Sequence, residues 1–569
     1  MSRKSWLFAI LAFLLACCVI TACAGAGILG ARERLQGLLG GQAGGQASGA
    51  EQATAAVPPQ RSTPAAGGND ERPSGGTLRL AGGLPPTLDP AMAQDSTSAE
   101  YIVHLFSGLV RLNGDLVVVP DLADHWTVSD DGRLYTFVLR ENAQFADGRA
   151  ITAADVIGSL ERACSPELGS PVAASYLNDI VGVADYAQGR AASIAGLRAP
   201  TPDSVEITID APKAYFTAKL TYPAAFVVDR QQIEAEGQSW VQHPNGSGPF
   251  VLAELTAQRI VLERNARYYG PGPALDRVEY LVTGGYPVTM YENNELDIVE
   301  VPPSEMERLL DPENPLHDEV RMSSELSVTY LGLNVQQAPF DDPAVRQAFA
   351  MAIDKAKIAD LVLQGGGTVA AGILPPGMPD FDPSLVGYRY DPEGARRLLA
   401  GSRYGQNGTM PPVVLAISGS SGYMDSVTEA VLSLVEDNLG IAITVHQVDW
   451  ADFLRDMSAR RYQMYLTGWI VDYPDSENFL DLLFHSASPQ NHMGYSSAAV
   501  DQLLEHARLE QDPAQRTQEY REAERLIVAD APWIPLVHGL RVSLIKPNVQ
   551  GFAATSAIYP WLQDVYLGQ

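Results

Sequence analysis

A group of carboxylates follows a predicted buried strand in the segment GWIVDYPDSENFL, which begins at Gly468. Its first acid, Asp472, comes directly after the apolar run Trp469-Ile470-Val471. An ionised carboxylate that is buried without a partner costs several kcal/mol, so a positive group is expected to meet it. This position predicts a binding site for a cation at Asp472, supplied either by a ligand or by the protein itself.

Catalysis would need more than these acids. Asp472, Asp475 and Glu477 could be imagined as a glycosidase pair, but such a pair needs a set separation across a cleft. Acids clustered after a strand more often cap a helix, which would here run from Asp475 to Phe484. The sequence contains no HExxH motif, and SGSSG at 418–422 lacks the G-x-S-x-G nucleophile elbow. An exported hydrolase, the main alternative from another functional class, is therefore not predicted, and no catalytic residues are assigned.

Metal and thiol chemistry are also not predicted. His485 and His492 lie seven residues apart and could hold a metal only if other ligands converged on them, so we expect solvent-facing histidines. Cys164 is predicted to be a half-buried small hydrophobe, because nothing near it in sequence would lower its pKa. No phosphate-binding G-x-x-x-x-G-K-[ST] motif is present, and no cofactor is predicted.

Composition limits the classes of partner. The 569 residues exceed one ordinary core and predict two or three domains, and 46% hydrophobic content is normal for a globular protein. The formal net charge of -29 argues against nucleic acid as a partner, and against attachment to an anionic membrane through basic patches.

The N-terminus predicts export. Arg3 and Lys4 precede the apolar run from Trp6 to Ile20, and Thr21-Ala22-Cys23 follows, which resembles the lipobox of bacterial lipoproteins. Residues 1–22 are thus a predicted signal peptide, and Cys23 is the predicted lipidation site. The alternative, an uncleaved anchor, is disfavoured because a helical span needs about 20 apolar residues.

The segment 23–74 is rich in Gly, Ala, Gln, Ser and Pro and has no apolar period, as in a flexible tether. We therefore expect a body held on a lipid at the outer face of the cytoplasmic membrane. Whether that face lies in a periplasm or on the cell surface depends on the envelope.

Two regions of different pattern follow the tether. A strand at 76–80 and an amphipathic segment at 98–109 precede a β-meander between 115 and 145, and Thr152 with Asp155 forms a capping box for a helix to about 162. From Tyr330 strands and helices alternate, with two helices in 497–530 and a last strand group from Pro532. This predicts two lobes, with chain crossings near Tyr330 and Pro532.

Seven blocks, in order along the chain, resemble the extracellular solute-binding proteins of family 5, the oligopeptide and dipeptide receptors of ABC importers. The blocks are VPDLADHWTVSDDGRLYTFVLRENAQFADGRAITAADVIGSLERA (119–163), GSGPFVL (246–252), LERNARYYGPGPALDRVEY (262–280), YLGLNVQQAPFDDPAVRQAFAMAID (330–354), ILPPGMPDF (373–381), GWIVDYPDSENFL (468–480) and YREAERLIVADAPWIPLVHG (520–539).

The resemblance implies an α/β, two-lobed fold of the periplasmic-binding-protein type II, large and similar to cluster C, with an extra domain inserted in the first lobe. The expected boundaries are 75–114, 225–329 and 535–569 for the first lobe, 115–224 for the inserted domain and 330–534 for the second lobe. Ligand would be enclosed between the lobes of a monomer by hinge closure, and the closed receptor would deliver it to the membrane subunits of an ABC permease.

In peptide receptors of this family, an acid matching Asp472 receives the ligand's α-ammonium group, and an aromatic residue matching Trp469 lines the cleft. The alternatives are that Asp472 caps a helix or pairs internally, and that Trp469 is packed core. Some receptors carry an arginine for the ligand's carboxylate where this chain has Leu466, so carboxylate recognition is unassigned.

The resemblance leaves other classes of ligand open. The family also includes receptors for oligosaccharides, nickel complexes and other small solutes. Aromatic platforms formed by Trp469, Tyr473 and Trp450 would favour sugars, which stack on ring faces, and Tyr473 is thus a further candidate ligand residue. The same fold could also present its ligand to a membrane sensor.

Overall fold

The computed structural model describes residues 73–282, 285–406, 408–419, 422, 424–552 and 559–568. The predicted signal peptide, Cys23 and all but the last two residues of the predicted tether lie outside these ranges. None of the helices in the described ranges combines the length and the apolar character that a membrane span requires.

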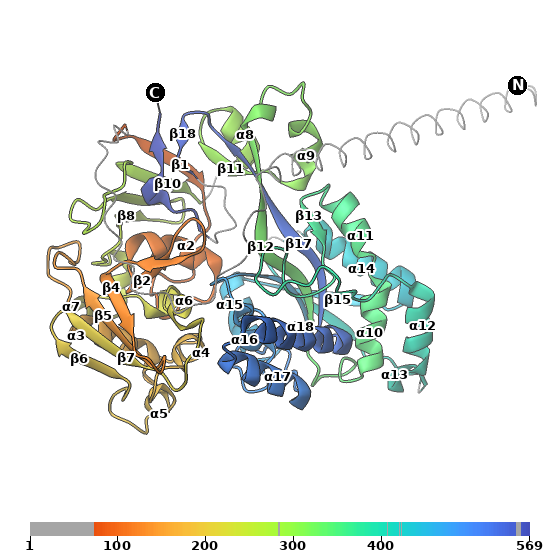
Figure 1. Cartoon of the computed structure of the whole chain (residues 1–569). Helices are drawn as coiled ribbons and strands as arrows, with labels where there is room; N and C mark the ends of the chain where they lie inside the picture. Colours follow the sequence, from red (N-terminus) through yellow and green to blue (C-terminus); the bar gives the residue numbers. More distant parts are fainter. Residues whose placement is uncertain are drawn as a thin grey trace, which may run out of the picture.

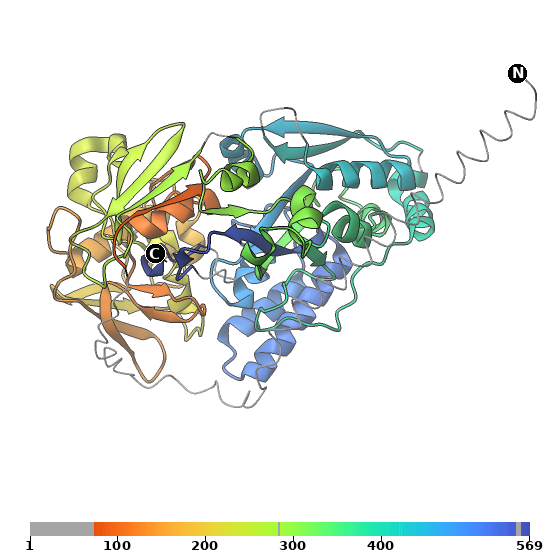
Figure 2. The ribbon, with the colours of Figure 1, turned by 90° about the horizontal axis from the view of Figure 1, so that it is seen from above.

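Two lobes share one mixed β-sheet (Figures 1 and 2). Two long antiparallel strands at its centre, β12 (Val320–Leu333) and β17 (Trp533–Ile545), pass between the lobes. The strands follow the order β15 (Ile443–Val448), β14 (Val413–Ser418), β16 (Met464–Ile470), β12, β17, β11 (Ile298–Glu300), β1 (Thr77–Ala81), β10 (Arg277–Leu281), β9 (Arg259–Arg264) and β8 (Phe250–Leu255), and β13 (Gly367–Val369) also pairs with β17. The predicted two-lobed α/β fold is confirmed.

The first lobe is built on β1, in which buried and half-buried side chains alternate as they should in a strand with one core face. Leu78 and Tyr280 lie in its core, under α2 (Ser96–Leu105). The other elements of this lobe are β2 (Val110–Leu112), α7 (Arg230–Glu236), α8 (Pro287–Glu292), α9 (Pro303–Leu309), β18 (Val549–Gln550) and β19 (Tyr566–Leu567).

The predicted inserted region forms a separate four-stranded antiparallel sheet of order β4-β5-β7-β6, with helices packed against it (Figure 1). The predicted capping box is confirmed, because the Thr152 backbone N–H donates to the Asp155 carboxylate over 2.9 Å at the start of α3. The elements are β3 (Val118–Pro120), β4 (Ala123–Val128), β5 (Leu134–Leu139), α3 (Ala153–Cys164), α4 (Ala173–Leu177), α5 (Val183–Ala187), β6 (Leu197–Thr201), β7 (Ser204–Thr208) and α6 (Phe216–Lys219).

Helices surround the second half of the sheet in the other lobe (Figure 1). The two helices predicted between 497 and 530 are present, and Asp512 with Pro513 starts the second of them, where the Asp512 carboxylate accepts from backbone N–H groups. The helices are α10 (Pro343–Ala352), α11 (Lys355–Lys357), α12 (Pro392–Gly401), α13 (Arg403–Gln406), α14 (Ser426–Leu439), α15 (Trp450–Ser458), α16 (Asp481–Phe484), α17 (Ala498–Leu509) and α18 (Pro513–Asp530).

One expected element differs in the structure. The helix expected from Asp475 to Phe484 is broken into a 3-10 turn, η5 (Ser476–Asn478), and the short α16. Tyr330 lies in β12 and Pro532 directly precedes β17, so both predicted crossings fall at the central strand pair. The residue boundaries given above for the lobes remain predictions.

Candidate functional site

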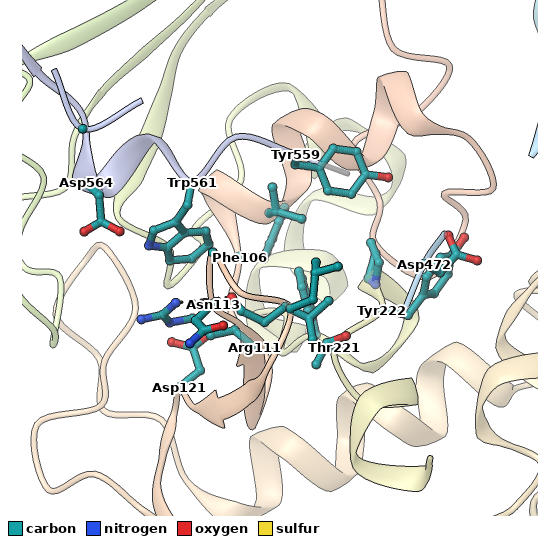
Figure 3. A pocket seen from close by; sticks show the side chains of 17 residues that line it. Phe106, Arg111, Asn113, Asp121, Thr221, Tyr222, Asp472, Tyr559, Trp561 and Asp564 are labelled. Atoms are coloured by element: carbon teal, nitrogen blue, oxygen red, sulfur yellow. Dashed lines mark hydrogen bonds between the residues drawn. The ribbon is translucent and has the colours of Figure 1, made fainter. Parts of the chain in front are cut away.

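A pocket lies between the lobes and opens toward Asp472 at one end (Figure 3). The space inside it is about 120 Å³. Asp472 is its only lining residue from the predicted second lobe, and the other walls come from the first lobe and the inserted region. The lining residues are Val103, Phe106, Arg111, Leu112, Asn113, Gly114, Leu116, Asp121, Thr221, Tyr222, Pro223, Phe226, Asp472, Gly551, Tyr559, Trp561 and Asp564.

Asp472 lies two residues after the end of β16, and its carboxylate has neutral partners. The hydroxyl of Tyr176 in α4 donates to Oδ2, and so does the side-chain amide of Asn478, over 2.9 Å. Asn478 also accepts the Asp472 backbone N–H over 2.9 Å, which fixes the turn after the strand. No lysine, arginine or histidine in the described ranges forms an ion pair with Asp472.

The charge of Asp472 is therefore not balanced within the described chain. Burial raises the pKa of the Asp472 carboxyl to about 6, and the hydrogen bonds from Tyr176 and Asn478 oppose that rise. A ligand ammonium at this carboxylate would restore the ionised form. The sequence left open whether Asp472 meets a ligand cation or pairs within the protein. In the structure it does pair within the protein, but only with neutral groups.

The other two predicted ligand residues lie elsewhere. Tyr473 is fully buried, and its hydroxyl donates to Glu477. Trp469 is half-buried against the core, and its indole N–H donates to Asn478 over 3.3 Å. Neither lines the pocket, so Asp472 alone of the three reaches it. The predicted platform of Trp469, Tyr473 and Trp450 does not form in this pocket, because Trp450 instead stacks on Phe453.

A cluster of charged side chains from the inserted region and the second lobe lines a second cavity, of about 190 Å³. Lys219 of the inserted region is almost completely buried and lies 2.9 Å from Asp179 and 3.5 Å from Glu477 of the second lobe. Asp179 is also paired with Lys213 at 2.5 Å. Burial lowers the pKa of Lys219, but the two acids raise it to a net value above its ordinary range, so this ammonium stays charged.

The remaining acids near this cluster also have arginine partners. Arg508 of α17 binds Asp481 at 2.6 Å, and Arg516 of α18 binds Asp475 at 2.7 Å. Arg516 also lies over the ring of Tyr215 from the inserted region, with 5.8 Å between the guanidinium carbon and the ring centroid. The acids imagined as a glycosidase pair thus differ, because Asp475 and Glu477 face cations and Asp472 does not.

The two histidines His485 and His492 and the single described cysteine, Cys164, are all buried. The expectation that His485 and His492 face solvent is wrong, because both side chains are buried; Glu505 approaches His485 at 3.2 Å, and burial lowers the pKa of His492 to about 4. Cys164 is buried as a small hydrophobe, and burial raises the pKa of its thiol to about 12. This agrees with a thiol that is not a nucleophile.

Sequence reasoning missed Asn478, Tyr176 and the aromatic wall of the pocket. Asn478 lies in the quoted segment GWIVDYPDSENFL, so an amide six residues after the acid was a usable signal for the turn that holds Asp472. Tyr176 lies 296 residues before Asp472 in the sequence. Trp561 lies close to the C-terminus. No pattern within either local segment indicates that these side chains meet at one pocket.

This chain is similar to bacterial solute-binding proteins. Residues 117–491 match the family described as bacterial extracellular solute-binding proteins, family 5 Middle. The chain is 30% identical over 483 residues to the probable deoxycholate-binding periplasmic protein YgiS of Escherichia coli, covering 82% of this chain and 89% of that protein. It is 29% identical over 490 residues to the periplasmic oligopeptide-binding protein OppA of the same species, covering 84% and 89%.

The solved structures agree with this. The murein tripeptide binding protein MppA of Escherichia coli superimposes with a TM-score of 0.80 at 27% identity, covering 87% of this chain and 98% of that one.

Proposed function

Because the chain belongs to the bacterial extracellular solute-binding proteins of family 5, we propose that it is the receptor of an ABC importer and that it binds peptides between its lobes. The observation that carries the peptide assignment is Asp472. Its carboxylate lines an interlobe pocket, is held by two neutral donors and has no cation of the described chain beside it. An α-ammonium group is the ligand chemistry that balances it.

The rest of the binding mode follows from the pocket walls. A charge-assisted hydrogen bond between the ligand ammonium and Asp472 is stronger in a closed cleft than in water. The apolar faces of Phe106, Phe226 and Trp561 give contact area for side chains without demanding one sequence. Water between ligand and wall would make the site tolerant of sequence.

Hinge closure is the proposed step that encloses the ligand. Tyr176 reaches Asp472 across the boundary between the lobes, and Lys219 reaches Glu477. The Gln490 side-chain amide also donates across it to the carbonyl of Pro171 over 3.1 Å. These contacts favour the closed form, since each can exist only when the lobes meet.

The remaining parts of the proposal concern the place of the receptor. Lipidated Cys23 would tether the body at the outer face of the cytoplasmic membrane, and the segment up to residue 74 would let it reach a permease. We propose that it acts as a monomer and passes its ligand to the permease without chemical change.

Ligand identification tests the peptide assignment. The full chain would be purified in detergent without denaturant, and the compounds released from it identified by native mass spectrometry. The proposal predicts short peptides, and their loss from Asp472→Asn. A ligand without an ammonium group, such as a sugar or a bile acid, would overturn the peptide assignment but leave the family unchanged.

A further inference from the structure

The end of the pocket away from Asp472 holds a cation without an ion-pair partner in the described chain. Figure 3 shows Arg111 there, at the opposite side from Asp472. Its guanidinium carbon lies 4.6 Å from the ring centroid of Trp561. Within the described chain its guanidinium donates one hydrogen bond, to the Leu112 carbonyl over 3.4 Å, so most of its five N–H donors have no protein acceptor there.

The backbone around Arg111 fixes its position. Arg111 lies in β2, opposite Val119 of β3, and the turn between the two strands is closed by Asn113. The Asn113 side-chain carbonyl accepts the backbone N–H groups of Asp115 and Val117, over 3.0 and 2.9 Å. This orients its NH₂ group, which has no hydrogen-bond acceptor in the described ranges, at the same end of the pocket.

The acids at this end of the pocket attract Arg111, but neither forms an ion pair with it. Asp121 accepts the hydroxyl of Tyr269 over 2.5 Å, and burial raises its pKa to about 6, with Arg111 and Arg140 opposing that rise. Asp564 also lines this end but is exposed to water, which screens its charge. Within the described chain, the pocket therefore has an acid without a neighbouring cation at one end and an arginine without an ion pair at the other.

We infer that Arg111, with Asn113 beside it, binds the carboxylate of the ligand, so that the receptor selects peptides with a free C-terminus. This rests on the proposed peptide function and supplies the carboxylate partner that Leu466 cannot provide. A guanidinium presents paired donors that match a carboxylate, and the Asn113 NH₂ group adds a third. Both charges of a zwitterionic peptide then meet opposite charges within one pocket.

The test compares two probes on the full chain in detergent. One is a mixture of random di- to pentapeptides with free C-termini, and the other is the same mixture with C-terminal amides. Competition measured by native mass spectrometry should favour the free acids by about 10- to 100-fold at the peptide length that spans from Asp472 to Arg111, the range for a hydrogen bond to a charged group. Arg111→Gln should abolish this preference while leaving the amides bound as in the wild type.

Arg140→Gln is the matched control, because Arg140 also acts on Asp121 but does not line the pocket. It should keep the preference for free acids, and Asp472→Asn should weaken both mixtures without changing their ratio. Equal binding of acids and amides, or tighter binding of amides, would overturn the inference and leave the peptide function standing. Binding of neither mixture would overturn the proposed function as well. Thermal melting of each variant separates lost recognition from lost folding.

Discussion

Asp472 and Glu477 lie five residues apart on one segment, and the protein treats their charges in opposite ways. Glu477 faces Lys219, and the neighbouring acids Asp475 and Asp481 are paired with arginines. Asp472 has hydrogen-bond donors but no cation in the described chain. Burial raises the pKa of both carboxyls, to about 6 for Asp472 and about 7 for Glu477, but of the two only Glu477 has a cation of the described chain beside it.

This difference separates stability from recognition. Breaking a buried ion pair leaves an uncompensated charge and destabilises the fold. Removing a carboxylate that has no cation removes its desolvation cost along with its hydrogen bonds. Substitutions in the cluster should therefore change unfolding, and substitutions at Asp472 should change binding.

Lys219→Met should give the largest effect. We expect the free energy of unfolding to fall by about 3 kcal/mol, the lower end of the range for a broken buried pair, because Lys213 still faces Asp179. Chemical denaturation measures this. Lys357→Met, at an exposed lysine, should change stability by less than about 0.5 kcal/mol. Equal losses in the two variants would contradict the assignment of the cluster to stability.

Asp472→Asn should weaken peptide binding by about 100-fold, since it removes the charge that meets the ligand ammonium. Its unfolding free energy should fall by less than about 1 kcal/mol, because the amide carbonyl can still accept from Tyr176 and Asn478. Titration calorimetry and denaturation measure the two quantities. A variant that unfolds easily but binds normally would reverse the comparison.

The pH dependence of binding should follow Asp472. A ligand ammonium binds the ionised carboxylate, whose pKa is about 6 before binding, so lowering the pH below 6 protonates the site and weakens binding. The dissociation constant should rise by up to about tenfold per pH unit. Protonation of Asp121, at the other end, would act in the opposite direction on a bound carboxylate. A profile that keeps the same slope in Asp472→Asn would assign the effect to another group.

Tyr176→Phe should give the smallest effect, a weakening of peptide binding by about three- to tenfold. It removes one neutral donor that holds the Asp472 carboxylate and leaves Asn478 in place. Losing that donor should also raise the pKa of Asp472 further, which shifts the pH profile upward. An unchanged profile would show that Tyr176 does not position the acid.

Short stretches of sequence carried the signals for the two-lobed fold and also pointed to Asp472 as a candidate ligand residue. Strand alternation, the Thr152–Asp155 capping box and ordered family blocks are local signals, and each was visible in a short window. Arg111, Tyr176 and Trp561 join Asp472 only through the tertiary fold, so no local pattern could assign them. Tyr473 is adjacent to Asp472 in sequence but is fully buried, and the sequence alone did not distinguish the two environments.

The most direct measurement compares the affinity of the full chain for a peptide identified by its own release with that for the same peptide N-acetylated. Acetylation removes the ammonium charge and adds an acetyl group, and the Asp472→Asn variant controls for the added bulk. The account predicts about a 100-fold loss for the wild type and no difference between the two peptides for Asp472→Asn. Equal affinity of the wild type for both peptides would contradict the role of Asp472.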